Sequence, residues 1–357
     1  LLARCLLMPF WGHNDAVWPS WMAKFVVEGH WNIYQYLFDA FGSQTLEPIV
    51  WAPYPPLFYY LTAGWLWVVD SIGLLDLQRW AAQWDLVHVS RTLFLLRFPY
   101  LVFDLAMWFF LCRLVPSAKQ ALLTAFWALC PVTLFTGYMM GQNDLYPTLF
   151  VALGLHLAWR VLKEEGVSFV WKAGAAASLG VGAGFKTFPL ILLPLFVIFL
   201  ADDWREAVSL AGLGLIPFLV AIAPFLSSGP FLEGSLLNPE GMGLLNLGYS
   251  TGAQTGYVFL IGYFLVVLHW LFGGRERTFR QLWASCLGIL ALLYATSWWP
   301  FNWLVWSVPL LLLALLACRS ARILYIGLNV HFLVWTWWWG DSLGAGMIPL
   351  SSSLSGF

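Results

Sequence analysis

The chain has 357 residues, of which 61% are hydrophobic and only 10% are charged, and its mean hydropathy is +0.77. These values lie far from the composition of soluble domains and indicate a protein with many membrane spans. The formal net charge of −1 excludes the strongly basic surface that nucleic-acid binding requires. The 24 Trp residues fit the same class, because Trp favours the membrane interface.

The first ten residues form an apolar run that is too short to cross a membrane. As a helix it would rise about 15 Å, against about 30 Å of hydrocarbon. We expect it to be the truncated remainder of a first span. No small-residue cleavage site precedes Trp11, so it does not resemble a signal peptide. No soluble domain and no repeat of fixed period follow, which predicts a single integral membrane domain over residues 1–357.

Ten further apolar runs, bounded by charges or turn residues, predict membrane helices. They lie near residues 91–113, 119–138, 144–162, 167–185, 187–201, 206–226, 255–273, 279–298, 301–318 and 323–340. With the partial first span they predict an all-α bundle of about 11 to 13 transmembrane helices. Five connections, RLVPSAK, RVLKEEG, DDWRE, GGRERTFR and CRSAR, hold ten of the seventeen Lys and Arg residues. The excess of positive charge assigns these connections to the cytoplasm.

The segment from residue 11 to 91 then lies on the outer side. Residues 54–70 are apolar enough to cross, but a crossing would move either the basic connections outside or the acidic 11–53 segment inside. We therefore expect a re-entrant or in-plane helix there. The helical spacing of Trp18, Trp21 and Phe25 predicts an amphipathic interfacial helix, one of a set that covers a cavity. A second outer loop, 227–254, is either a lid that contacts substrate or an ordinary flexible loop.

Asp15 follows the first apolar run by a few residues, which places its carboxylate at the outer interface. A carboxylate half shielded from water can act as general base for a sugar hydroxyl. It can equally be a helix cap, because Asp is a favoured N-cap residue and Pro19 follows near the first turn. The position alone favours the cap.

Arg97 and Asp104 are seven residues apart and share one face of a predicted span. Ionisable groups at membrane depth usually face the protein interior and pair with another group. For Asp104 we favour a structural ion pair that ties helices together. Arg97 lies nearer the outer end and could instead hold a phosphate.

Two further polar sites interrupt the apolar runs. The sequence GQND places Gln142, Asn143 and Asp144 on the outer side, where they could bind sugar hydroxyls or form an ordinary turn and helix cap. Lys186, in GFKTFP, lies in a connection expected to be sunk below the membrane surface. Such a cation needs a partner, and an anionic lipid phosphate and a snorkelling lysine are equally good explanations. In SWWPFNWLVW, Trp299, Phe301 and Asn302 mark another outer turn, with sugar stacking or an aromatic belt as alternatives.

The sequence lacks the usual metal and nucleotide motifs. The five Cys residues show no CxxC spacing and read as buried small hydrophobic residues, and the six His residues show no HExxH pattern. P-loop, GxSxG and dinucleotide-binding fingerprints are also missing.

Several blocks in order resemble the GT-C glycosyltransferases that use polyprenyl-phosphate sugars, such as the dolichyl-phosphate-glucose glucosyltransferases and bacterial polyprenol-phosphate-mannose mannosyltransferases. The blocks are GHND, EGHWNIYQY, YPPLFYYL, LLRFPYLVFDL, YMMGQNDLYPTLF, GFKTFPLILLP and PFNWLVWSVPLL, from about residue 11 to 312. Each is weak singly. Their order and spacing carry the resemblance.

The resemblance implies that Asp15 is the catalytic base, which reverses the preference for the cap. It implies an inverting transfer of a hexose, mannose or glucose, to a glycolipid, lipid-linked glycan or protein glycan. The active site would face the extracytoplasmic side, of the plasma membrane if the source is prokaryotic. It implies roles in substrate binding for Arg97, Gln142, Asn143 and Lys186, and we add Asn14, Tyr54, Asp144 and Asn302 as further candidate substrate-binding residues.

Two departures from the family pattern change the expectation. Asn14 stands where relatives often carry a second acid, so a divalent metal is doubtful and we expect no cofactor besides the lipid-phosphate donor. The late His-Pro-Gln type motif is replaced by Trp299, Pro300, Phe301 and Asn302. These departures leave room for a non-catalytic subunit of a membrane complex built on the same scaffold. A second alternative is a transporter or flippase for lipid-linked sugars, which would also need an outer cavity and buried charges. The transporter usually shows inverted repeats, which we do not find.

Overall fold

A computed structural model describes residues 1–9, 17–42, 52–83, 89–164, 166–237, 247–250, 255–273, 276–297 and 300–338. These parts are almost entirely helical, which confirms the all-α class, with one short antiparallel hairpin as an exception. In the hairpin, β1 (Gly248–Ser250) pairs with β2 (Thr255–Tyr257), and Tyr249 lies opposite Gly256.

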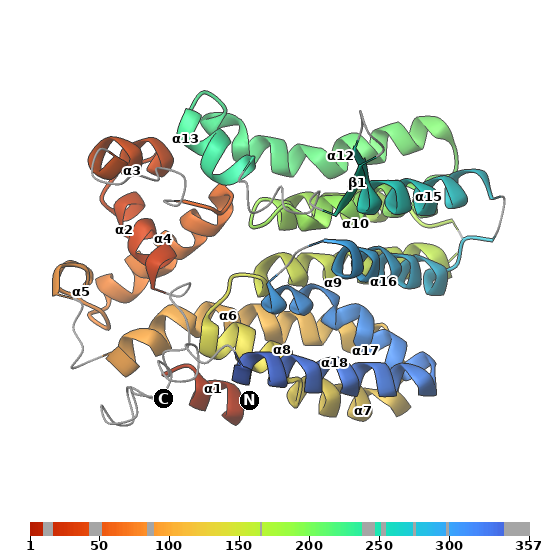
Figure 1. The fold of residues 1–357 in the computed structure, drawn as a ribbon, viewed down its shortest axis with the longest axis horizontal. Helices are drawn as coiled ribbons and strands as arrows, with labels where there is room; N and C mark the ends of the chain where they lie inside the picture. Colours follow the sequence, from red (N-terminus) through yellow and green to blue (C-terminus); the bar gives the residue numbers. More distant parts are fainter. Residues whose placement is uncertain are drawn as a thin grey trace.

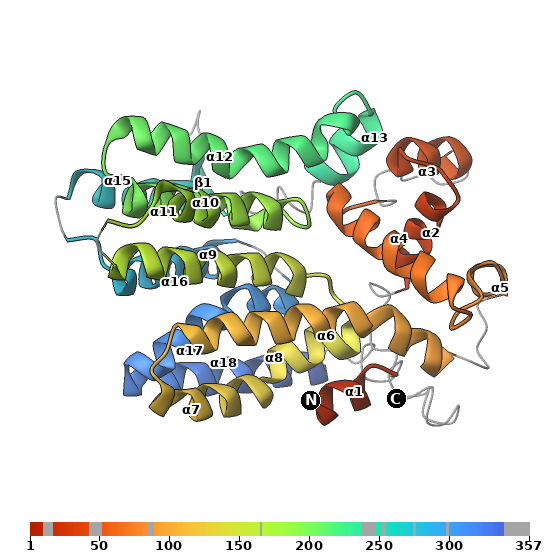
Figure 2. The same ribbon diagram turned by 180° about the vertical axis from the view of Figure 1, so that it is seen from behind.

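The long helices lie side by side and run along the longest axis of the molecule (Figure 1, and from behind in Figure 2). Each of the ten predicted runs after residue 90 forms helical structure. The elements are α6 (Val89–Arg113), α7 (Ser117–Ala128), α8 (Pro131–Thr133), the π-helix η5 (Leu134–Met140), α9 (Leu145–Lys163), α10 (Phe169–Ala183), the 3₁₀ turn η6 (Phe188–Ile191), α11 (Leu193–Leu200), α12 (Trp204–Ile222), η7 (Ala223–Phe225), α15 (Val258–Phe272), α16 (Phe279–Thr296), the 3₁₀ helix η10 (Phe301–Ser307), α17 (Val308–Ala317) and α18 (Arg319–Trp338).

Four of these helices are long and apolar enough to cross a membrane: α6, α9, α16, and α12 continued by η7 to Phe225. A fifth span results if α7 and the 131–140 segment are counted as one, since they meet at a bend of 47°. The protein is therefore a helical membrane protein. The larger number of 11 to 13 spans stays a prediction, because several of the predicted runs form shorter helices such as α10 and α11.

Four helices of the N-terminal segment gather at one end of the long helices (Figure 1). They are α2 (Trp18–Val27), α3 (Ile33–Phe41), α4 (Pro56–Ser71) and α5 (Leu77–Gln83), and α2 packs on α4. We call them the cap helices. The predicted amphipathic helix is confirmed in α2, which buries Met22 and Phe25 and pairs Lys24 with Glu28 at 2.9 Å. The predicted helix at 54–70 forms as α4, and its re-entrant or in-plane placement stays a prediction.

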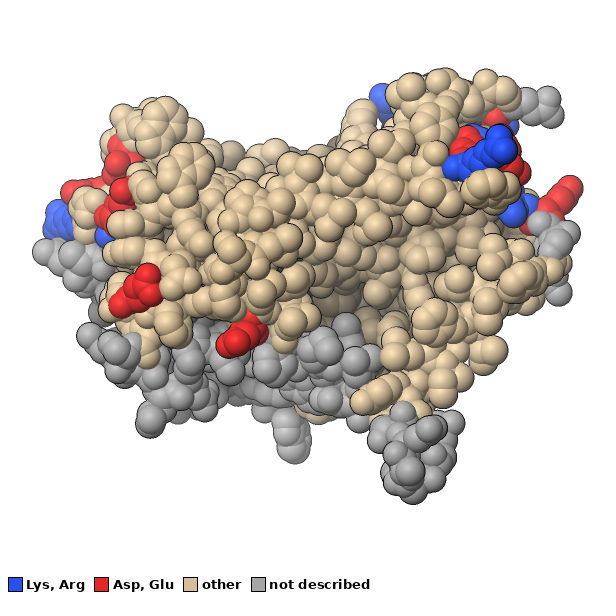
Figure 3. Space-filling model, turned by 90° about the horizontal axis from the view of Figure 1, so that it is seen from above, with Lys and Arg blue, Asp and Glu red and all other residues tan. Residues whose placement is uncertain are grey.

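The basic connections meet at the opposite end. Lys119 Nζ donates to the carbonyl of Leu316 at 2.8 Å, which joins the start of α7 to the end of α17. Arg277 donates to the carbonyl of Ala201 at 2.8 Å. In the space-filling view, charged side chains gather at the two ends and a broad uncharged zone lies between them (Figure 3). This distribution is the one expected for a protein whose long axis follows the membrane normal.

The segment predicted as a second outer loop is partly regular. Residues Gly229–Phe231 form the turn α13 and Leu232–Leu236 form the π-turn η8, and β1 follows. Pro230 explains why a helical turn forms in this predicted loop, because its ring presets a helical φ at the first turn of α13. Residues 238–246 and 251–254 of that loop lie outside the described residues.

The apolar run at the N-terminus forms α1 (Leu2–Leu7). Arg4 within it is fully buried and binds Asp104 of α6, with Nε to Oδ2 at 2.6 Å. Trp127 and Tyr138 donate to the same carboxylate, both at 2.7 Å. This confirms the predicted structural role of Asp104, which holds α1 against α6. Its cation is Arg4, from a segment about a hundred residues away.

Candidate functional site

A buried ion pair lies where the cap helices meet the long helices. Lys186 Nζ approaches Asp144 Oδ1 to 2.7 Å. Asp144 directly precedes α9, and Lys186 lies between α10 and η6. The start of α4 joins the same region, because Leu57 N–H donates to the carbonyl of Gly184 at 3.1 Å. Three segments distant in sequence therefore meet at this pair.

The Asp144 carboxylate is fully buried and accepts from three side chains. Besides Lys186, Trp306 Nε1 donates to Oδ1 at 2.8 Å and Asn302 Nδ2 donates to Oδ2 at 3.4 Å. Asp144 stands at the N-cap position of α9, but its side chain makes no capping hydrogen bond. The turn-and-cap alternative therefore holds for its position only. The carboxylate binds the Lys186 cation in place of a backbone N–H of its own helix.

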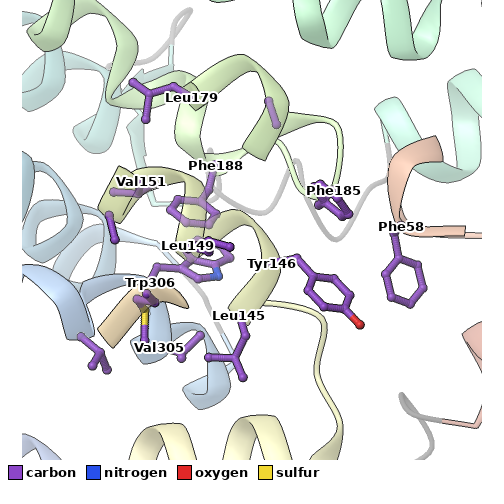
Figure 4. Packing of buried hydrophobic residues seen from close by; sticks show 14 of the residues in the cluster. Phe58, Leu145, Tyr146, Leu149, Val151, Leu179, Phe185, Phe188, Val305 and Trp306 are labelled. Carbon is purple, nitrogen blue, oxygen red and sulfur yellow. The ribbon is translucent and has the colours of Figure 1, made fainter. Parts of the chain in front are cut away.

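Aromatic rings surround the Lys186 ammonium. Its Nζ lies 5.8 Å from the Tyr54 ring centroid, 5.2 Å from Trp303 and 5.3 Å from Trp306. Phe188 fixes the Trp306 indole by stacking on it, with centroids 4.3 Å apart and planes 4° apart (Figure 4). Each ring within about 6 Å attracts a cation through its quadrupole. The lysine side chain keeps 16% exposure, so this cation is held in place without being sealed from a ligand.

The 141–144 turn owes its shape to Gly141 and to the π-helix before it. Gly141 has φ of 74°, a left-handed conformation that a residue with a Cβ adopts at a cost. Its carbonyl accepts from Tyr100 Oη at 2.9 Å, and Gln142 N–H returns to the carbonyl of Thr136 at 2.9 Å. π-helical turns occur often at functional sites, because they redirect the chain that follows. Here the turn carries Gln142, Asn143 and Asp144, the three polar residues predicted to bind sugar hydroxyls.

Arg97 joins the same region to the N-terminal segment. Its guanidinium is fully buried and donates to the carbonyl of Met139 and to the carbonyl of Met8, both at 2.6 Å. It therefore ties α6 both to the end of η5 and to the residues that precede Asp15 in the chain. Phosphate binding by Arg97 stays a prediction, since these carbonyls already occupy two of its donors.

Most of the predicted site residues come together. One cluster contains Tyr54, Asp144, Lys186 and Asn302. Gln142 and Asn143 precede Asp144 in the same turn. Arg97 donates to the carbonyl of Met139, two residues before that turn. Asp15 and Asn14 lie outside the described residues, as does Trp299. The partner of Lys186 is a carboxylate, where the sequence suggested a phosphate or a snorkelling side chain.

Sequence reasoning missed Trp303 and Trp306. Trp306 stands four residues after Asn302, and both donate to Asp144. The amide and indole N–H donors grouped in the short segment Phe301–Ser307 were the available signal. Arg4 was also missed. It is a lone charge in the first apolar run, and a charge at that depth indicates a buried partner, which is Asp104.

Within the described ranges, no group of three or more His, Cys, Asp or Glu side chains could hold a metal ion. His13 and Asp15 fall outside those ranges. The expectation of a metal-free site therefore stays a prediction.

Comparison of the chain with protein-family models, with curated proteins and with solved structures finds no match in any of the three. The function proposed below therefore rests on the residues of this chain and their geometry.

Proposed function

We propose that the protein is an integral membrane glycosyltransferase that transfers a hexose, mannose or glucose, from a polyprenyl-phosphate sugar. The acceptor is a glycolipid, a lipid-linked glycan or a protein glycan, and the site faces the extracytoplasmic side. The observation that supports the proposal most is the buried Lys186–Asp144 pair under aromatic rings, next to the cap helices. The ordered sequence blocks that resemble GT-C enzymes supply the reaction class.

In the proposed reaction each group has a separate task. Asp15 takes the proton of the acceptor hydroxyl, and the hydroxyl oxygen attacks the anomeric carbon with inversion. The bond from that carbon to the phosphate oxygen breaks, and the lipid phosphate leaves with the electron pair. The Lys186 cation stabilises the negative charge that grows on this phosphate. A lysine held by a carboxylate serves a similar purpose in protein kinases, where the pair positions the cation for phosphate contact.

The test is the substitution Asp15→Asn in the purified full chain. We expect transfer from a polyprenyl-phosphate hexose to fall by about a hundredfold or more, the usual contribution of a general base. Asp39→Asn is the matched control, because Asp39 is an exposed carboxylate of the same segment. We expect it to retain activity. Radiolabelled sugar transfer is measured for both, and normal membrane insertion and elution as a folded protein are required of both.

Transfer that survives Asp15→Asn unchanged would rule out this role of Asp15. A wild-type protein that binds the donor but never transfers sugar would instead support the non-catalytic subunit. Movement of lipid-linked sugar across vesicles, without transfer, would support the flippase.

A further inference from the structure

Asn143 is a buried amide whose hydrogen-bonding capacity is unused. The residue is 1% exposed, and neither Oδ1 nor Nδ2 has a hydrogen-bond partner within the part of the chain that the structure describes. The fully buried hydroxyl of Thr136 also lacks a partner among those residues. Roughly nine in ten buried polar groups are paired, and an unpaired one carries a desolvation penalty that calls for an explanation.

Both groups belong to the site already described. The hydrogen bond from Gln142 N–H to the carbonyl of Thr136 brings Thr136 beside the 141–144 turn. The Asn143 carbonyl accepts from Tyr146 N–H at 3.0 Å, which fixes its backbone. Its neighbour Asp144 is fully engaged with Lys186. Adjacent residues therefore differ: the Asp144 carboxylate accepts from three side chains, and the Asn143 amide has no hydrogen-bond partner among the described residues.

The chemistry of an amide restricts the ligand. Asn143 presents an acceptor at Oδ1 and a donor at Nδ2, and Thr136 presents a hydroxyl that can do either. An ionised phosphate offers acceptors only and leaves Oδ1 unsatisfied. Neighbouring hydroxyl groups on a sugar ring offer donors and acceptors together. The unpaired groups therefore fit a neutral polyol better than an anion.

We propose that Asn143, assisted by Thr136, is the residue that recognises the hydroxyl groups of the sugar, while Lys186 takes the phosphate. The inference rests on the proposed function for the identity of the polyol as the donor sugar. The donor is thereby bound in two parts, its sugar by the Asn143 amide in the 141–144 turn and its phosphate by Lys186, which contacts the same turn through Asp144. Asn143 thereby determines which hexose is accepted.

The experiment compares the affinity for farnesyl-phosphate hexose with that for farnesyl phosphate, by calorimetry on the full chain in lipid nanodiscs. In the wild type we expect the hexose to add about tenfold or more to the affinity. Asn143→Leu should remove this gain and leave the affinity for farnesyl phosphate unchanged. Lys186→Gln should lower both affinities.

Thermal stability of the unliganded protein separates recognition from a structural role. Leu has the same number and branching of side-chain heavy atoms as Asn and has no polar group to desolvate, so Asn143→Leu should melt at the same temperature or higher. The matched control is Asn329→Leu. Asn329 is also buried, but its Nδ2 donates to the carbonyl of Tyr325 at 2.8 Å and its Oδ1 accepts from Val132 N–H at 3.5 Å. Its substitution should lower the melting temperature and keep the gain from the hexose.

A hexose gain that persists in Asn143→Leu overturns the inference, and so does an equal loss of both affinities. Asn143→Ala, tested with monodeoxy hexose donors, is the second variant. The wild type should discriminate against at least one deoxy donor, and Asn143→Ala should not; failure of both variants to fold assigns Asn143 a structural role instead. A hexose gain through Asn143 without any transfer would overturn the proposed reaction alone, whereas transfer without that gain would overturn this inference alone.

Discussion

Asp144 and Lys186 show how a membrane protein keeps two charges buried. The carboxylate has no exposure, and its three donors come from segments 42 to 162 residues away in sequence. Charges at such depth are tolerated only when paired, because the desolvation of each ion is severe. The pair therefore acts as a unit, and neither partner can be lost alone without leaving an uncompensated charge.

At this scale we expect Lys186→Met to destabilise the protein by about 3–5 kcal/mol, because the Asp144 charge remains buried without its cation. The double variant Lys186→Met with Asp144→Asn should recover most of this loss, since the charge is gone and the amide oxygen still accepts from Trp306. Unfolding in detergent micelles measures both. A double variant no more stable than the single one would show that the ion pair is not the cause.

The elements pack most closely where glycines face one another. A Cβ on Gly180 of α10 would collide with the carbonyl of Gly214 in α12, and a Cβ on Gly214 would meet the Leu193 side chain. Membrane helices approach closely through such small residues, since apolar lipid tails provide no hydrophobic drive for association between helices. The short helix α10 is thereby held between α9 and α12, which places Lys186 beyond its end.

We expect Gly180→Ala to separate α10 from α12 and to destabilise the protein by about 1–3 kcal/mol, the usual effect of overpacking. Gly212→Ala in α12 is the control, since a Cβ there meets nothing within 4 Å. It should leave stability unchanged or raise it by about 0.5–1 kcal/mol through helix propensity. Thermal unfolding compares the two. Equal effects would show that the contact of α10 with α12 tolerates a methyl group.

On the scale of the whole molecule, the two charged ends define the orientation. The cap helices and the candidate site lie at one end, and the connections richest in Lys and Arg lie at the other. Positive connections favour the cytoplasm, so the site is expected outside, where polyprenyl-phosphate sugars would be used.

Cys318 provides a test of this orientation. It is exposed at the basic end, between α17 and α18, and backbone N–H groups of Ala321 and Ser320 lower the pKa of its thiol from the ordinary value of 9.0. A membrane-impermeant maleimide should label it in inside-out vesicles but not in right-side-out vesicles. Because the thiolate is the reactive form, labelling should increase at a lower pH than for an ordinary thiol and shift upward on denaturation.

The experiment uses a chain in which the half-buried Cys5 and Cys112 are replaced by Ser, and Cys318→Ser in that chain should abolish the signal, since Cys130 and Cys286 are buried. Labelling from the outer side would reverse the topology and move the candidate site to the cytoplasm.

The protein class and most helix positions could be predicted from the amino-acid sequence, because the apolar runs end at charges and turn residues. The run predicted at 91–113 forms α6 (Val89–Arg113), and the run at 144–162 forms α9 (Leu145–Lys163). The sequence also identified Lys186 and Asp104 as ionisable groups that must have partners, since an isolated charge is too costly at membrane depth.

The partners of these charged groups became clear from the packing of the helices. Lys186 binds Asp144, Asp104 binds Arg4, and Arg97 binds two carbonyls, all through segments distant in the chain. A local sequence pattern indicates that a buried charge needs a partner of opposite charge or a hydrogen-bond partner. Which atom serves as that partner depends on how the helices pack. The unused amide of Asn143 is likewise invisible in the sequence, because an unpaired group is recognised only after every neighbour is in place.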